Sequence, residues 1–169
     1  VCNNQIETYR AEGKLNNLKK ILGKKLVDTH MGIGHTRWAT HGIPSKINAH
    51  PHSTDEVSIV HNGIIENFLK LKTNLIDKGH IFKSQTDSEV IAHLITDHLN
   101  SGCTPEDSIK KTLPLLEGAF AIAVIFKESK LLIGARKGSP LAFYNISGLS
   151  FGKREVLSRI NNQVKPWTE

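Results

Sequence analysis

Residues 34–63 form the most informative segment of the chain and read GHTRWATHGIPSKINAHPHSTDEVSIVHNG. Two runs typical of short β-strands lie in and around this segment, at 31–38 and 57–61, and each run ends in polar and glycine residues. Binding sites are commonly built where strands end and loops begin. The segment therefore predicts a binding site at which the ends of these two strands meet.

The first run ends in Arg37, Trp38, Thr40, His41 and Gly42. These residues supply a guanidinium group, an aromatic ring, a hydroxyl and an imidazole. The planar guanidinium holds its N–H donors in a fixed fork that binds a carboxylate through two parallel hydrogen bonds, which a lysine cannot do. The first run therefore indicates that the ligand is a small acid.

The second run ends in Asn62 and Gly63. Asn-Gly is the commonest signal for a tight β-hairpin turn, and for this dipeptide alone the turn is the favoured interpretation. A functional interpretation stands beside it. The side-chain amide of Asn62 and the backbone N–H of Gly63 are adjacent donors that could stabilise a developing oxyanion.

Further motifs follow the same order as in a known family. Together they resemble the glutaminase domain of glutamine–fructose-6-phosphate aminotransferase, a class II glutamine amidotransferase. The resemblance distinguishes this family from phosphoribosyl-diphosphate amidotransferases and asparagine synthetases, which share the fold. We therefore expect a partial amidotransferase domain at 1–142 and a divergent C-terminal tail at 143–169. The motifs are HTRWATHG at 35–42, NAHPH at 48–52, VHNGIIEN at 60–67, QTDSEVI at 85–91 and ARKGSPL at 135–141.

The resemblance implies an activity and a set of site residues. The activity is hydrolysis of glutamine to glutamate and ammonia, which in this family supplies the synthesis of glucosamine 6-phosphate and hence amino-sugar metabolism. By resemblance, Arg37 binds the α-carboxylate of glutamine and Asp87 its ammonium, while Asn62 and Gly63 form the oxyanion hole. The other implied residues are Trp38, Thr40 and His41, which shape the pocket, and His50, in a loop that meets the synthase domain.

The nucleophile of this family is an N-terminal cysteine that is followed by a Gly-Ile or Gly-Val segment and uses its own α-amino group as the base. Neither Cys2 nor Cys103 has that context. We therefore expect a chain truncated at both ends, without the nucleophile and the sugar-isomerase domains, and inactive alone. Two alternatives remain, a non-catalytic module that binds glutamine or glutamate and one half of a split enzyme completed by a separate chain. No cofactor is expected.

The chain also contains nine histidines, which leaves a third alternative, a metal-dependent hydrolase. His50 and His52, with His35, His41 and His61, are the candidate ligands. The sequence has no HExxH pair on a helix and no recognisable spacing of carboxylate or thiolate ligands. We therefore expect no metal.

The hydrophobic pattern alternates strands and helices and predicts an α+β domain. The resemblance is more definite and implies the four-layer αββα sandwich of the N-terminal-nucleophile hydrolases, in incomplete form. Thr86 and Glu89 predict a capping box. The expected elements are a strand at 1–10, a helix at 15–22 closed by Gly23, helices at 67–78, between Thr86 and Gly102, and at 104–117, and a β-hairpin of 119–126 with 130–136.

Composition agrees with one soluble domain. The 169 residues, of which 38% are hydrophobic, suffice for one core but not for two full domains. The net charge of +6 is scattered in short lysine pairs, so no nucleic-acid partner is expected. No apolar stretch is long enough to cross a bilayer and no signal peptide is visible, so we expect a cytoplasmic protein with reduced cysteines.

Overall fold

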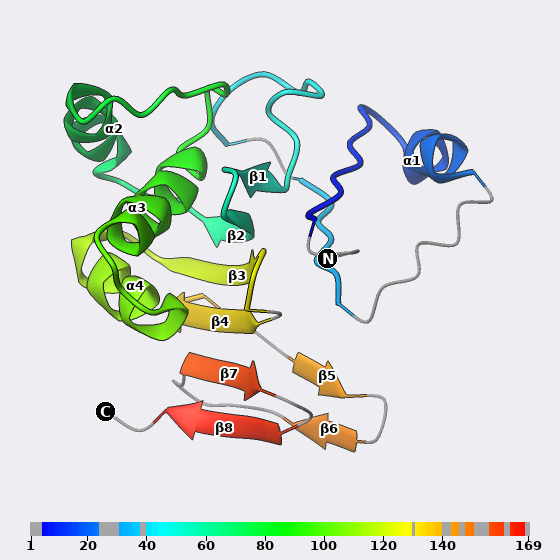
Figure 1. Cartoon of the computed structure of the whole chain (residues 1–169). Helices are drawn as coiled ribbons and strands as arrows, with labels where there is room; N and C mark the ends of the chain where they lie inside the picture. Colours follow the sequence, from blue (N-terminus) through cyan, green and yellow to red (C-terminus); the bar gives the residue numbers. More distant parts are fainter. Residues whose placement is uncertain are drawn as a thin grey trace.

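The fold is built on an antiparallel sheet in the order β1-β2-β3-β4-β7-β8 (Figure 1). The computed structural model describes residues 5–23, 31–37, 40–129 and 131–139 in full, and the backbone alone of strands β5 to β8. Strands β5 and β6 form a separate two-stranded sheet. The strands are β1 (His52–Ser53), β2 (Val57–Gly63), β3 (Phe120–Phe126), β4 (Leu132–Lys137), β5 (Phe143–Asn145), β6 (Gly148–Ser150), β7 (Val156–Ile160) and β8 (Gln163–Trp167).

Three helices cover one face of this sheet (Figure 1). They are α2 (Phe68–Asp77), α3 (Glu89–Asn100) and α4 (Pro105–Thr112), and a short 3-10 helix (Leu113–Leu115) follows α4. Helix α1 (Leu15–Leu22) lies apart from them, beside the N-terminal segment (Figure 1). No helix among the described residues is long and apolar enough to cross a membrane.

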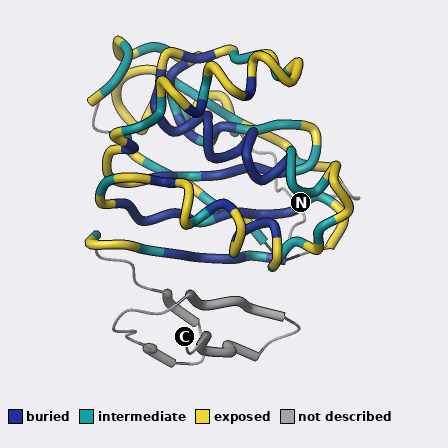
Figure 2. Tube along the Cα trace, turned by 90° about the vertical axis from the view of Figure 1, so that its left-hand side faces the viewer, coloured by how far each residue is buried: buried dark blue, intermediate teal, exposed yellow. Residues whose placement is uncertain are grey.

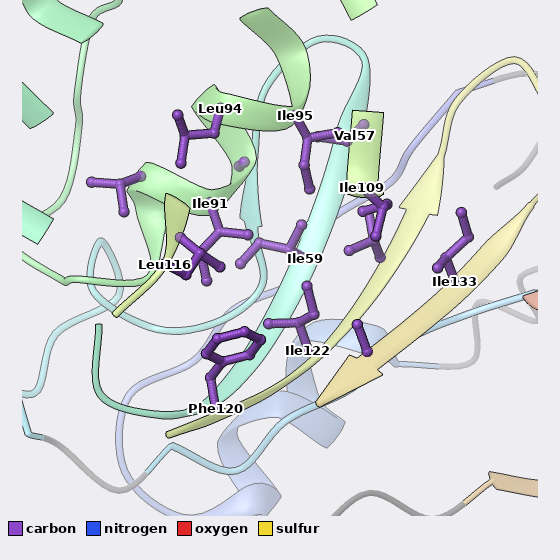
Figure 3. Packing of buried hydrophobic residues seen from close by; sticks show 14 of the residues in the cluster. Val57, Ile59, Ile91, Leu94, Ile95, Ile109, Leu116, Phe120, Ile122 and Ile133 are labelled. Carbon is purple, nitrogen blue, oxygen red and sulfur yellow. The ribbon is translucent and has the colours of Figure 1, made fainter. Parts of the chain in front are cut away.

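The hydrophobic core lies between the sheet and these helices (Figure 3). Successive side chains of a strand point to opposite faces, so alternate residues of β2 and β3 meet α3 and α4. Burying one such side chain fully contributes about 1.5–3 kcal/mol, and this burial holds β2 against α3. The largest fully buried side chains are those of Ile59, Ile65, Leu75, Ile91, Ile95, Ile109, Leu116, Phe120, Ile122 and Ile133.

The buried stretches in Figure 2 lie on strands β2 to β4 and on the helix faces turned toward them, whereas the outer helix faces and most loops are exposed. This distribution confirms most of the elements expected from hydrophobic periodicity. Helices α1 to α4 and the β3–β4 hairpin lie at the expected positions. At the start of α4 the Thr104 hydroxyl accepts a hydrogen bond from the backbone N–H of Asp107 (3.1 Å), as expected of an N-cap.

Two predicted strands are absent from the described residues. Residues 31–37 and 6–10 form no regular strand, and residues 1–4 lie outside the part of the chain that the structure describes. Gly32 and Gly34 have no side chains to pack against a sheet, which weakens a strand at 31–37. This segment instead makes its contacts through the side chains of His35 and Arg37.

The Asn62–Gly63 turn and the Thr86–Glu89 capping box are also corrected. Asn62 and Gly63 are the last residues of β2 and pair with β3, so the long-range ladder overrides the local turn signal. The Thr86 hydroxyl lies 3.0 Å from His52 Nε2, and Glu89 accepts hydrogen bonds from the backbone N–H groups of Lys83 and Ser84. The two halves of the capping box thus have other partners, which are distant in the sequence for Thr86 and nearby for Glu89.

Candidate functional site

The backbone N–H of Gly63 points toward the open edge of β2. Residues of an antiparallel pair alternate between hydrogen-bonded and non-hydrogen-bonded positions. The bonds from Ile64 N to Ala119 O (3.1 Å) and from Lys127 N to Glu56 O (2.9 Å) fix the phase of the β2–β3 ladder. Gly63 therefore occupies a non-hydrogen-bonded position, and its N–H points away from β3. Strand β1 does not extend to this point, so none of the strands that the structure describes pairs with this N–H.

Only glycine fits at this crossing of the chain. Gly63 has a φ of 124°, and a Cβ there would lie 2.1 Å from the carbonyl oxygen of Ala119. Gly118 faces the same constraint, because its φ is 105° and an added Cβ would lie 2.3 Å from the carbonyl oxygen of Ile64. Both values of φ lie in the region that side chains disfavour. The two glycines let the end of β2 and the start of β3 approach closely.

Asn62 is oriented by His35. His35 Nε2 donates a hydrogen bond to Asn62 Oδ1 over 2.7 Å. Because the oxygen of the amide is engaged, its Nδ2 group is left to donate elsewhere. Asn62 thus offers a side-chain donor beside the backbone donor of Gly63, as an oxyanion hole requires.

Asp87 lies at the start of α3 and is 3% exposed. Its Oδ2 accepts a hydrogen bond from the backbone N–H of Ile65 (2.8 Å), which ties it to the segment that follows β2. Its Oδ1 lies 3.8 Å from Nδ1 of His41. The N-terminal end of a helix favours negative charge, so this position suits a buried carboxylate.

Arg37 holds the loop that follows it. Its Nη2 donates to the carbonyl of Gly42 (3.0 Å) and also to that of His41, and its Nη1 donates to the carbonyl of Ile43 (3.4 Å). Burial lowers the pKa of Arg37, and the negative charge of Asp87 acts in the opposite direction. The positive charge of Arg37 and the negative charge of Asp87 are therefore close enough to affect each other.

These groups line one cavity of about 270 Å³. Of the expected site residues, the cavity brings together Arg37, Thr40, His50, Asn62, Gly63 and Asp87. His41 lies beside Asp87 and contacts the ring of Phe68 edge-on at 5.1 Å. Trp38 lies outside the described residues. The lining residues that sequence reasoning did not assign to the site are His35, His61, Ile64, Thr86 and Ser88.

Two histidines of the cavity, His50 and His61, are neutral at pH 7. Burial lowers the pKa of His61 to about 4 and that of His50 to about 2. His61 Nδ1 lies 2.8 Å from the hydroxyl of Ser88, whereas His61 Nε2 and His50 Nδ1 are buried without a hydrogen-bond partner in the described part of the chain. The cavity wall is therefore polar but gains no positive charge from these two rings. Sequence reasoning had assigned His50 but not His61, and the position of His61 directly before Asn62 and Gly63 is the signal that could have placed it here.

Among the described residues, the cavity has neither a metal-binding cluster nor a cysteine thiol. No group of three or more His, Cys, Asp or Glu side chains there has an arrangement that could hold a metal ion. Cys103, the cysteine that the structure describes, precedes α4, and its Sγ lies 3.2 Å from Lys111 Nζ. It does not line the cavity. Cys2 lies outside the described residues.

The sequence matches a family model described as a glutamine amidotransferase domain over residues 35–153. This match covers more than half of the chain, so the chain belongs to the glutamine amidotransferase domain family. The match includes every residue of the cavity described above.

Within this family the chain is similar to glutamine–fructose-6-phosphate aminotransferases. It is 55% identical to the enzyme of Bradyrhizobium diazoefficiens over 139 residues, which are 82% of this chain and 23% of the relative. It is 54% identical to that of Gluconobacter oxydans over 138 residues, which are 81% of this chain and 23% of the relative. The chain thus spans about a quarter of the length of these relatives.

Two solved structures confirm the type of fold. Glutamine phosphoribosylpyrophosphate amidotransferase from B. subtilis aligns with a TM-score of 0.61 and 26% identity, over 79% of this chain and 33% of the other. A structure described as the allosteric regulatory enzyme of purine biosynthesis aligns with a TM-score of 0.58 and 24% identity, over 73% and 31%. The expected α+β fold of the N-terminal-nucleophile type is confirmed. Of its four layers, the structure describes one helical layer, formed by α2 to α4, on the six-stranded sheet.

Proposed function

We propose that this chain binds glutamine and forms part of a glutaminase that supplies ammonia. One observation carries the proposal: a cation, a carboxylate and two neutral N–H donors line the same small cavity. Glutamine carries a carboxylate and an ammonium at one end and a carboxamide at the other. A site for its hydrolysis must bind both charged groups and stabilise the oxyanion that forms at the amide carbon.

The proposed roles follow the positions of the side chains. Arg37 binds the α-carboxylate with the N–H groups that it does not use for the 41–43 loop, since a guanidinium has five. Asp87 binds the ammonium. Gly63 N–H and Asn62 Nδ2 stabilise the oxyanion, with Asn62 held by His35. The proposed pocket walls are Thr40, His41 and Trp38, and we assign His50 to a loop that meets a synthase domain.

The names of the relatives extend this proposal to a whole reaction. In it, the ammonia released here aminates fructose 6-phosphate, and the product is glucosamine 6-phosphate. The support is the 55% identity to a glutamine–fructose-6-phosphate aminotransferase. This chain spans 23% of that enzyme. We propose a cytoplasmic location as well, because two cysteines as far apart in the sequence as Cys2 and Cys103 suit a reducing compartment.

Hydrolysis also needs a nucleophile, and the described lining of the cavity contains no cysteine thiol to serve as one. We propose that the thiol comes from chain outside the described residues or from a separate polypeptide. The same observation favours a second candidate function, a module that binds glutamine or glutamate without hydrolysing it. Ammonia release separates the two candidates, because only the first produces it.

Isothermal titration of L-glutamine and L-glutamate into the purified protein tests the shared part of both candidates. We expect binding that weakens about tenfold or more in Arg37→Ala, because a charge-assisted pair with the carboxylate is lost. Lys70→Ala, which removes an exposed cation from α2, is the matched control and should bind as the wild type does. Absence of binding, or equal effects of the two substitutions, contradicts the proposal.

A further inference from the structure

Asn48 connects two loops that border the cavity. It is 1% exposed. Its Nδ2 donates to the carbonyl of Ile43 (2.9 Å) and to Oε1 of Gln85 (3.1 Å), and its Oδ1 accepts from the backbone N–H of Gln85 (3.0 Å). The side chain therefore uses its donor group and its acceptor at the same time. One buried amide holds the loop after Arg37 to the segment that leads into α3.

Each of these loops carries one charged group of the site. The Ile43 carbonyl that accepts from Asn48 also accepts from Arg37 Nη1 (3.4 Å). Gln85 is two residues before Asp87 in the sequence. A short path of hydrogen bonds and backbone thus runs from the guanidinium through Asn48 to the carboxylate.

The junction is closely packed around Gly42. A Cβ at this position would lie 2.8 Å from Asn48 Nδ2 and 3.0 Å from the Cβ of Gln85, and Gly42 has a φ of 74°. A side chain there would force the two loops apart. The spacing between the loops is therefore set by a tight contact as well as by hydrogen bonds.

The charges on the two loops attract each other, since Asp87 acts to raise the pKa of Arg37. Among the described ion pairs, however, Asp87 pairs with His41 rather than with Arg37. A ligand that carries a carboxylate and an ammonium needs both groups free and at a fixed separation. A rigid connection between the loops supplies that separation at little entropic cost on binding.

We propose that Asn48 is a positioning residue that fixes the spacing between Arg37 and Asp87, and so selects ligands that carry a carboxylate and an ammonium on one carbon. This inference rests on the proposed function. The residue type suits the role because Asn48 donates to two oxygens and accepts from one N–H. Aspartate would place a third acceptor against the two oxygens, and leucine would leave all three partners unsatisfied.

The test compares L-glutamine with two probes that each lack one charged group. The first, 4-carbamoylbutanoate, lacks the ammonium, and the second, 4-aminobutanamide, lacks the carboxylate. Affinities are measured by titration calorimetry for the wild type, Asn48→Ala and Asn48→Asp. Asn74→Ala is the matched control, because Asn74 is exposed on α2.

In both Asn48 variants we expect glutamine to bind about tenfold more weakly, whereas each probe changes by less than about threefold. Each charged group still binds its own partner, and only their joint geometry is lost. The control should match the wild type. Equal weakening of all three compounds would indicate a general loss of structure and overturns the inference, as does unchanged binding of glutamine. A wild type that binds no glutamine overturns the proposed function itself.

Discussion

Two glycines shape the proposed oxyanion site at the scale of single residues. Gly63 and Gly118 each lie where an added Cβ would collide with a backbone oxygen of the opposite strand. The collision cannot be relieved by a rotamer change, because the obstructing atoms belong to the main chain. The close approach that they permit leaves the N–H of Gly63 at the cavity. The Asn-Gly dipeptide predicted a turn. In the structure, Gly63 is instead required because a side chain at this position would collide with the backbone beside it.

Gly118→Ala should lower the free energy of unfolding by about 3 kcal/mol or more, since it combines a disfavoured φ with a main-chain clash. Gly102→Ala is the matched control. Gly102 has a φ of 84° but nothing within 4 Å of the added Cβ, so only strain of about 1–2 kcal/mol is expected. Urea denaturation of both variants measures the difference. Equal losses of stability would show that the clash at Gly118 does not exist.

At the scale of elements, hydrophobic periodicity predicted helices and strands well where the chain has a repeating apolar pattern. Helices α2 and α3 and the β3–β4 hairpin are examples, because each buries one continuous face. Local signals failed where a distant partner competes for the same group. Thr86 forms a hydrogen bond with His52 and does not cap its own helix. Asn62 pairs with β3 and does not form a hairpin turn. Such partners are far apart in the sequence and leave no periodic pattern.

Glu89 stabilises the segment that precedes α3 and carries Asp87, because it forms hydrogen bonds with Lys83 and Ser84. It is 4% exposed, and its carboxylate accepts hydrogen bonds from Ser84 N (2.7 Å), Ser84 Oγ (2.6 Å) and Lys83 N (2.9 Å). Burial acts to raise the pKa of Glu89, but His93, whose Nε2 lies 3.7 Å from Oε1, and the hydrogen bonds from Ser84 and Lys83 outweigh it and lower the pKa to about 2. A carboxylate with a depressed pKa stabilises the fold above its unfolded pKa of 4.5, and that contribution is lost as the pH falls toward 2.

Glu89→Gln should therefore be about 2–3 kcal/mol less stable than the wild type at pH 7, and the difference should shrink as the pH falls from about 5 toward 2. Urea unfolding of both proteins across this range measures the effect. His61 also gains a proton near pH 4, but it is common to both proteins and cancels in the difference. His52 does not cancel fully, because the negative charge of Glu89 acts to raise its pKa and that effect is lost in the variant. A difference that does not change with pH would contradict the assigned role of Glu89.

At the scale of the whole molecule, the sequence predicted the family and the type of fold, because motifs spaced along more than half of the chain identify both. It did not reveal that Arg37 also holds the 41–43 loop, that Asn48 joins the two loops, or that buried histidines stay neutral. These properties depend on burial and on contacts between distant segments. The division of the chain at residue 142 remains a prediction.

The most direct test of the central claim is an NMR titration of isotope-labelled protein with L-glutamine, because it shows where the ligand binds. The account predicts saturable shifts of the Gly63 amide, the Asn62 side-chain amide and the Arg37 guanidinium signals, while the signals of α4 stay in place. D-Glutamine, with the opposite arrangement of its charged groups, should produce much weaker shifts. Shifts confined to other parts of the molecule, or none at millimolar L-glutamine, would contradict the proposal that this cavity binds glutamine.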